Sequence, residues 1–279
     1  VLPVDVLASA AEATLVEQSA APAAVSDGVD YRPQPDVRLG LNQVHGLAET
    51  AIARIVASRD AAAAAGRSPP WRSVTELARE AELGHHELQA LARANALARL
   101  AGHRPEAAWQ VAGLSKLPGL LAGASPDEDA VSLPPPSEGA EIVADYRALG
   151  LPMGRHPLAL LRRQLSRFRV ATAEELQTYP DGRLARASGL VTHRQRPGTA
   201  SGVVFLTLED DTGAVNVIVW PGHLERYRKA VLGGKLLTVY CTWQRDVNTG
   251  GQVTNLVAER IVDHTALLGS LEVRSRDFR

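Results

Sequence analysis

The residues best suited to chemistry are basic and aromatic, and most of them lie in the second half of the chain. The stretch 193–202 reads HRQRPGTASG and contains Arg194, Gln195 and Arg196. The planar guanidinium of arginine can bind a phosphate through two parallel hydrogen bonds and can also stack on a base. We therefore predict that this stretch is a loop that contacts nucleic acid.

Three aromatic residues extend the predicted surface. Phe205, Trp220 and Trp243 could each stack on a base, a contact that contributes ~1–3 kcal/mol when the ring is exposed. The alternative is that these rings fill the interior of a barrel. Alternation along a strand does not say which side faces inward, so both interpretations stay open for Phe205.

The groups that could support catalysis are not arranged for it. The acidic run 209–211 is followed by Thr-Gly between two strands, which favours a hairpin turn over a metal site. His85 and His86 have no cysteine or acidic motif beside them, and Cys241 lies in an apolar strand, which predicts a buried, unreactive thiol. We predict no catalytic residue, metal site or cofactor in this chain.

A second candidate for nucleic-acid binding lies in the first half. The stretch 41–55 reads LNQVHGLAETAIARI, in which Gly46 permits a sharp turn and a helix follows at once. Such a turn directs free backbone N–H groups outward, where they can bind a phosphate. Ala48 stands where the helix-hairpin-helix pattern usually has a second glycine. In a possible second copy, at 91–100, Asn95 takes the place of the turn glycine. An ordinary helical hairpin explains either stretch about as well.

Helices are expected to hold this hairpin in place. Helix signals run from residue 39 to about 115, including a capping box formed by Ser73 and Glu76. Residues 116–137 are rich in proline, glycine and serine, which predicts a linker. Further helices are expected after it, one of them beginning at Pro157.

Strands are expected to hold Arg194 and Arg196 in place. A first strand is expected before the 193–202 loop, and apolar residues alternate with period two at 203–208 and 215–220. A helix is expected through 224–231, and further strands are expected at 236–240 and 252–258. Five strands with a helix between the third and fourth are typical of an OB barrel. We therefore predict an α+β chain, with a helical helix-hairpin-helix module followed by a five-stranded OB-type barrel. The predicted segments are 1–38 (remnant of a preceding domain and a loop), 39–115 (helix-hairpin-helix module), 116–183 (linker and bridging helices), 184–265 (OB barrel) and 266–279 (C-terminal tail).

Charge is distributed unevenly along the chain. The net charge is −1, but residues 155–279 hold 18 lysines and arginines against 12 acidic residues, whereas residues 1–154 hold 12 against 19. A basic second half suits a phosphate-binding surface. The single cysteine favours a reducing cytoplasmic compartment, and no apolar run reaches the ~20 residues that span a bilayer.

Four stretches together resemble the C-terminal part of the bacterial error-prone DNA polymerases, C-family enzymes related to the polymerase III α subunit. They read VRLGLNQVHGLAETAIARIVASR, LARANALARL, LGLPMGRHPL and ASGLVTHRQRPGTASGVVFLTLEDDTGAVNVIVW, and the resemblance covers nearly the whole chain. It implies a nucleotidyltransferase used in DNA replication, damage-induced translesion synthesis and DNA repair. It also implies Mg²⁺-dependent nucleotidyl transfer from dNTPs, with the catalytic carboxylates upstream of this segment.

The resemblance also implies contact residues and partners. It implies DNA contacts by the amides of Gly46, Leu47 and Ala48 with duplex DNA, and by Arg194, Gln195, Arg196 and Thr199 with single-stranded template. A mutasome accessory protein and a sliding clamp are the implied protein partners. The LPGLL sequence within 110–121 is only faintly similar to a clamp-binding peptide.

Two other functions fit the residues without the resemblance. One is a stand-alone single-stranded DNA-binding accessory protein, and the other is a protein–protein adaptor that uses its OB surface to bind a mutasome partner. The chain opens on Val1 and contains one methionine, Met153, which favours a fragment of a longer polymerase.

Overall fold

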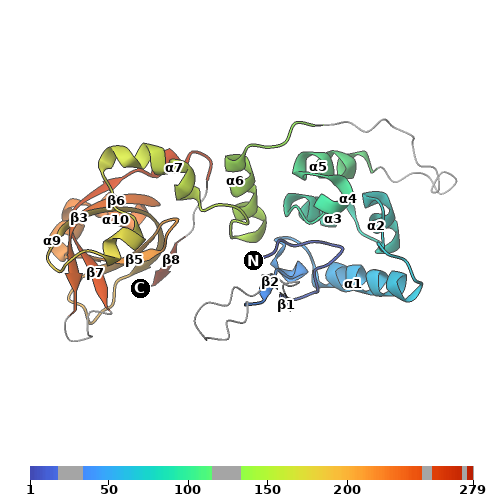
Figure 1. Ribbon diagram of the computed structural model, residues 1–279, viewed down its shortest axis with the longest axis horizontal. Helices are drawn as coiled ribbons and strands as arrows, with labels where there is room; N and C mark the ends of the chain where they lie inside the picture. Colours follow the sequence, from blue (N-terminus) through green and yellow to red (C-terminus); the bar gives the residue numbers. More distant parts are fainter. Residues whose placement is uncertain (18–33, 115–132, 247–252, 272–274, 279) are drawn as a thin grey trace, which may run out of the picture. The chain divides into compact units, whose positions relative to one another are not determined.

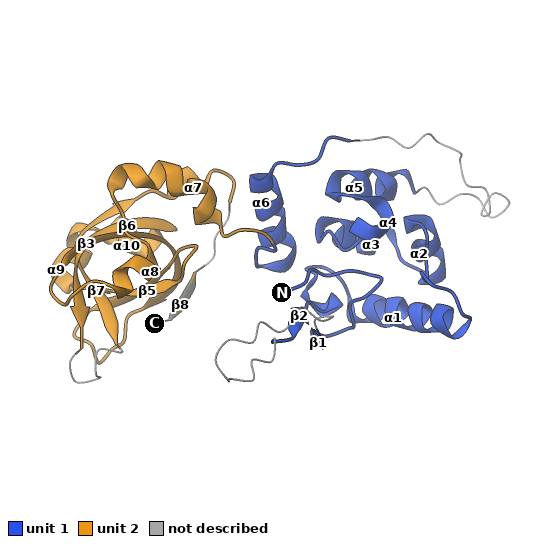
Figure 2. Cartoon of the chain, in the orientation of Figure 1, with its two compact units in different colours: residues 1–153 blue, residues 154–279 orange. Residues whose placement is uncertain are grey.

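The computed structural model describes residues 1–17, 34–114, 133–246, 253–271 and 275–278. They form two compact units, residues 1–153 and 154–279, coloured separately in Figure 2. The sequence predicted five segments, and the structure instead divides the chain once, between 153 and 154. The predicted linker and the LPGLL sequence fall mostly outside the described residues.

Unit 1 is mainly helical (Figure 1). Its elements are β1 (Thr14–Val16), β2 (Asp36–Arg38), η1 (Leu41–Gln43), α1 (Glu49–Ala64), α2 (Val74–Glu80), α3 (His85–Arg93), α4 (Ala98–Ala101), α5 (Arg104–Gly113) and α6 (Glu138–Leu149).

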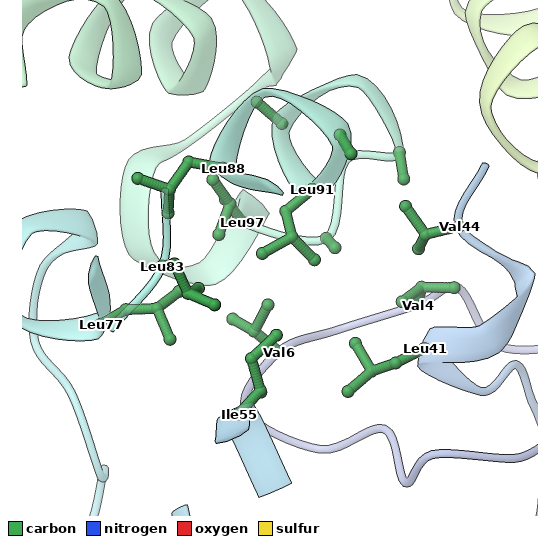
Figure 3. Close-up of a cluster of buried hydrophobic side chains, with 14 of the residues drawn as sticks. Val4, Val6, Leu41, Val44, Ile55, Leu77, Leu83, Leu88, Leu91 and Leu97 are labelled. Atoms are coloured by element: carbon green, nitrogen blue, oxygen red, sulfur yellow. The ribbon is translucent and has the colours of Figure 1, made fainter. Parts of the chain in front are cut away.

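The core of unit 1 includes residues from the very start of the chain. Val4 and Val6 are buried among Leu41, Ile55 and Leu91 from the helical region (Figure 3). Residues 1–17 therefore pack as part of the helical module, whereas the sequence placed them in the remnant of a preceding domain. A turn begins at Val6, and the strand pairing of this part of the chain is between β1 and β2.

Local signals set the helix ends as predicted. The Ser73 hydroxyl accepts a hydrogen bond from the Glu76 amide at the start of α2, and Gly66 adopts a left-handed conformation just after α1. Asn95 has a φ of 58°, so asparagine makes the turn where glycine was expected. The Ser73 hydroxyl pairs with a backbone group that the helix end leaves unpaired, whereas Gly66 and Asn95 turn the chain at the end of a helix.

A buried ion cluster joins three helices of unit 1. Arg104, at the start of α5, donates from Nε to the Arg93 carbonyl at the end of α3 (2.8 Å). Its other guanidinium nitrogens contact the carboxylates of Glu141 and Asp145 in α6. Asp145 also accepts the Met153 amide at 2.8 Å, so both of its oxygens are paired.

Unit 2 contains a β-barrel with helices at its ends. Its elements are α7 (Pro157–Leu165), η3 (Ser166–Phe168), α8 (Ala173–Gln177), β3 (Leu184–Gln195), β4 (Val204–Glu209), β5 (Ala214–Val219), α9 (Pro221–Arg226), α10 (Arg228–Gly233), β6 (Leu236–Arg245), β7 (Thr254–Asp263), η5 (Thr265–Leu268) and β8 (Arg276–Phe278).

The sheet closes on itself in the order β4-β5-β7-β6-β3, because β3 also pairs with β4. Only β5 and β7 run parallel among these five strands, and α9 and α10 lie between the third and fourth strands. The predicted α+β fold, a helical module followed by a five-stranded OB-type barrel, is confirmed. A short sixth strand, β8, adds parallel to the end of β3 and was not predicted.

Gly189 allows β3 to pair with both β6 and β4. β3 pairs with β6 up to Leu190 and with β4 from Leu190 onward. A Cβ at Gly189 would lie 2.7 Å from the Leu208 Cβ and 2.9 Å from the Glu209 amide nitrogen of β4. Only glycine allows β4 to approach β3 this closely, so the closure of the barrel depends on it.

Among the described residues, the helices are all too short or too polar to cross a membrane.

Candidate nucleic-acid interface

The outer surface of the barrel is hollowed on one side. This hollow, called the barrel groove below, has a volume of about 460 Å³. It is lined by His193 and Gln195 of β3, Phe205 and Thr207 of β4, Asn216 of β5 and Asn255 of β7.

The strand registers explain why these residues meet. Thr207 lies opposite His193 on one side and opposite Asn216 on the other, and Asn216 in turn lies opposite Asn255. Four strands therefore contribute one polar row across the barrel. The Thr207 hydroxyl donates to the Asn216 side-chain oxygen at 3.3 Å. Hydroxyl and amide groups of this kind can hydrogen-bond to base edges.

A second row lies beside the polar one. Gln195, Phe205, Ile218 and Val257 occupy opposed positions on β3, β4, β5 and β7. Phe205 is half-buried, and its ring borders the groove, where it can stack on a base. The arrangement of a ring beside neutral hydrogen-bonding groups suits binding of unpaired bases.

Arg194 does not point into the groove, which corrects the prediction that it lies in a phosphate-binding loop. β3 continues to Gln195, so Arg194 is a strand residue on the inward side and is only 8% exposed. Its Nε donates to the Val231 carbonyl at 2.9 Å, and Nη2 donates to the Gly234 carbonyl at the end of α10. Nη1 contacts Ser275 and, at 3.3 Å, Asp277.

The sequence prediction that Trp243 stacks on a base is also wrong. Its side chain is 0% exposed and lies in the barrel core, so it cannot stack on a ligand. The cause is the alternation along β6, where Val239, Cys241 and Trp243 share the inward side. The alternative interpretation, in which an aromatic fills the barrel, holds for this residue.

The loop after β3 follows directly on Gln195, which lines the groove. Arg196 and Thr199 are exposed there, and Trp220 is 52% exposed where β5 ends. A Cβ on Gly202 would lie 3.8 Å from Arg196 Nη2 and 3.7 Å from the Pro221 ring. The loop thus folds over the start of α9, and the Arg196 guanidinium lies close to the residue that follows Trp220.

The hairpin turn of unit 1 has the geometry that its glycine predicted. Gly46 has a φ of 84°, and α1 begins at Glu49 directly after Ala48. Gly46 and Ala48 are exposed and Leu47 is half-buried. Within the described residues the amides of Gly46 and Ala48 donate no hydrogen bond, whereas the Leu47 amide, also predicted to contact DNA, donates to the Val44 carbonyl at 3.2 Å. His45 caps α6, since its amide donates to the Ala148 carbonyl at 2.9 Å.

The acidic run between β4 and β5 is a structural turn, as predicted. Asp210 accepts from the amides of Thr212 and Gly213, and Arg162 of α7 donates to both Asp210 and Asp211. Burial alone would raise the pKa of Asp210, but the hydrogen bonds from Thr212 and Arg162 outweigh it and hold the pKa below its usual value. Across the described part of the chain, no group of three or more His, Cys, Asp or Glu side chains could hold a metal.

Cys241 should not react while the barrel is folded. Burial, with a smaller contribution from Glu259, raises the pKa of the thiol from 9.0 to about 12. We expect no labelling by a thiol reagent at pH 8 until denaturant opens the barrel. The stability that the neutral thiol contributes is fully present below pH 9 and is lost as the pH rises toward 12. Rapid labelling of the folded chain would contradict this assignment.

Three groove residues, Thr207, Asn216 and Asn255, were not predicted as site residues. His193 was recognised only as the start of the predicted loop. The sequence did contain a signal for two of them, because a hairpin turn at 210–213 places Thr207 opposite Asn216 on the paired strands. The parallel pairing of β5 with β7, which adds Asn255, has no local signal.

Two family models match the chain, one in each unit. A helix-hairpin-helix motif matches residues 1–107, and an OB-fold nucleic acid binding domain matches residues 185–263. The first match includes residues 1–17, in agreement with their packing in unit 1. A solved chain of asparaginyl-tRNA synthetase from Pyrococcus horikoshii is 24% identical over 34% of this chain and 23% of its own, with a TM-score of 0.29.

Relatives similar over the whole chain are much longer proteins. The chain is 48% identical over 282 residues to the error-prone DNA polymerase of Ralstonia pickettii, covering 100% of this chain and 25% of that protein. It is 49% identical to that of Ralstonia nicotianae (100% and 24%) and 51% identical to that of Aromatoleum aromaticum (88% and 22%). The chain is thus similar over its whole length to error-prone DNA polymerases, and it spans about a quarter of the length of these relatives.

Proposed function

We propose that this chain is the nucleic-acid-binding part of an error-prone DNA polymerase, and that its barrel groove binds the single-stranded template. The observation that carries the proposal is the pairing of the half-buried Phe205 ring with a polar row from four strands. Arg196 and Trp220 extend this surface at one end, where they can contact a phosphate and a further base.

The hairpin turn supplies a second contact in this proposal. The free amides at Gly46 and Ala48 and the start of α1 suit a duplex phosphate, which they would bind without reading sequence. Together the two units would hold primer-template DNA during translesion synthesis and DNA repair in the cytoplasm. Mg²⁺-dependent nucleotidyl transfer from dNTPs would be carried out by other parts of the longer protein. A mutasome accessory protein and a sliding clamp remain proposed partners.

The test is an anisotropy titration of the 279-residue chain with labelled single-stranded and duplex DNA at several salt concentrations. We expect single-stranded binding that weakens steeply with salt, because binding of phosphates releases counterions. Absence of single-stranded binding at low salt would reject the proposal. Salt-independent binding of a protein would favour the adaptor alternative instead.

Phe205→Ala should weaken single-stranded binding about 5- to 150-fold, which corresponds to the loss of one stacked base (~1–3 kcal/mol). The salt dependence should stay unchanged, because no charge is removed. Trp109→Ala is the matched control, since Trp109 is an aromatic residue of unit 1 that is 58% exposed. Equal affinities of the two variants would show that the groove is not the binding site.

A further inference from the structure

Three residues form a row on a different part of the barrel wall. Arg186 of β3 lies opposite Tyr240 of β6, and Tyr240 lies opposite Arg260 of β7. The two guanidinium carbons are each 5.1 Å from the centroid of the Tyr240 ring. At this distance a guanidinium is attracted to the ring, so one tyrosine orients two arginines. We call these three residues the Arg-Tyr-Arg row.

This row is separate from the barrel groove. β4 and β5, which carry half of the groove residues, contribute nothing to it, and β6 lies at its centre. On the two shared strands the groove residues nearest to the row are His193 and Asn255, seven and five positions away from Arg186 and Arg260. A ligand in the groove and a ligand on the row therefore contact different stretches of β3 and β7.

The row carries positive charge that the described residues do not neutralise. Arg186 and Arg260 are exposed, and neither forms an ion pair within the described part of unit 2; Arg186 donates only to the Phe168 carbonyl, at 3.4 Å. Glu259, the acidic neighbour of Arg260, accepts a hydrogen bond from the Thr242 hydroxyl at 2.8 Å.

A neighbouring turn adds to this charge. Arg167 and Arg169 are both exposed and flank Phe168, whose carbonyl Arg186 contacts. The turn is anchored to the barrel, because the Phe168 ring packs against His264 with 4.3 Å between centroids and the Ala171 amide donates to the Arg186 carbonyl at 2.7 Å. Four exposed arginines thus lie on β3, β7 and the anchored turn of unit 2.

We propose that the Arg-Tyr-Arg row binds the phosphate backbone of single-stranded nucleic acid, as a second contact for a strand whose bases occupy the groove. This inference rests on the proposed function. A phosphodiester backbone is the occupant that the charge selects, because guanidinium forks match phosphate geometry and the row carries two positive charges. The row would lengthen the bound strand without adding sequence preference.

The experiment compares two single-stranded oligonucleotides with the 279-residue chain. One has ~5 nucleotides, enough for the groove of an OB barrel, and the other has ~20 and can reach further. Arg186→Ala with Arg260→Ala should reduce affinity for the long strand and lower the magnitude of its log–log salt slope by about 1.4, that is, ~0.7 per lost phosphate contact. Affinity for the short strand should not change, which also shows that the barrel is folded.

Two further variants sharpen the test. Arg72→Ala with Arg79→Ala removes two exposed arginines from unit 1 and should leave the long-strand slope unchanged. Arg186→Lys with Arg260→Lys keeps the charge and should restore the slope. If the Arg186→Ala, Arg260→Ala variant binds the long strand with the same salt slope as the unaltered chain, this inference is wrong. The proposed function would not be affected by that result. If the unaltered chain binds neither strand, the proposed function fails and this inference fails with it.

Discussion

Replacing Arg194 by alanine is expected to lower the free energy of unfolding of the barrel by about 3 kcal/mol. The guanidinium is buried and donates to the Val231 and Gly234 carbonyls, which would lose their charged donor. It also contacts Ser275 and Asp277, so its loss should release β8 from the end of β3. The prediction follows from the inward position of Arg194 and concerns stability, not DNA contact.

Cys241 provides a measurement that reports on the barrel alone. It is the single cysteine of the chain and lies buried in the barrel core. Its labelling rate in urea should rise more than a hundredfold in Arg194→Ala, because each 1.4 kcal/mol multiplies the open population by ten. Arg196→Ala is the matched control, since this exposed arginine lies two residues along and should leave the rate unchanged. Equal rates in both variants would show that Arg194 does not hold the barrel together.

Replacing Arg104 by methionine should destabilise unit 1 by about 3–5 kcal/mol. Methionine retains much of the volume, but the buried carboxylate of Asp145, which is 4% exposed, would lose its charged partner. An unpaired buried charge costs more than the ion pair itself contributes. Hydrogen exchange measured by mass spectrometry should show faster exchange in α3, α5 and α6, while Cys241 labelling in unit 2 stays unchanged.

A double variant separates loss of the ion pair from loss of packing. Arg104→Met with Asp145→Asn removes the buried charge and keeps a side-chain oxygen for the Met153 amide, so it should recover part of the lost stability. Arg67→Met is the control, because the ion pair of Arg67 with Glu80 is solvent-exposed and contributes little. If the double variant were no more stable than Arg104→Met alone, the uncompensated carboxylate would not be the cause.

Much of the fold could be predicted because its signals are local. Ser73 and Thr172 each begin a helix with a glutamate three residues later, and both side chains cap their helix. The box is complete at Thr172, whereas Glu76 accepts from the Arg72 amide instead of the Ser73 amide. Gly46 and Asn95 adopt the left-handed conformation that their turns require. Such signals depend on a few neighbouring residues, so they survive whatever the rest of the chain does.

The candidate site could be predicted only in part. Phe205 and Arg196 were identified and lie where a ligand could reach them, whereas Arg194 and Trp243 face inward. The reason is that strands apolar on both sides carry no mark of which side is buried. A single position along β3 separates the buried Arg194 from the exposed Gln195.

The amino-acid sequence by itself determined the two modules, the turns and helix ends, and the five strands of the barrel, because periodicity and capping act over a few residues. Only the tertiary structure decided which side of each strand faces the groove. It also decided that four strands place Thr207 and Asn216 beside His193 and Asn255, and that Arg194 anchors β8. Those outcomes depend on strand register and barrel closure, which join residues 39 or more positions apart and leave no local pattern.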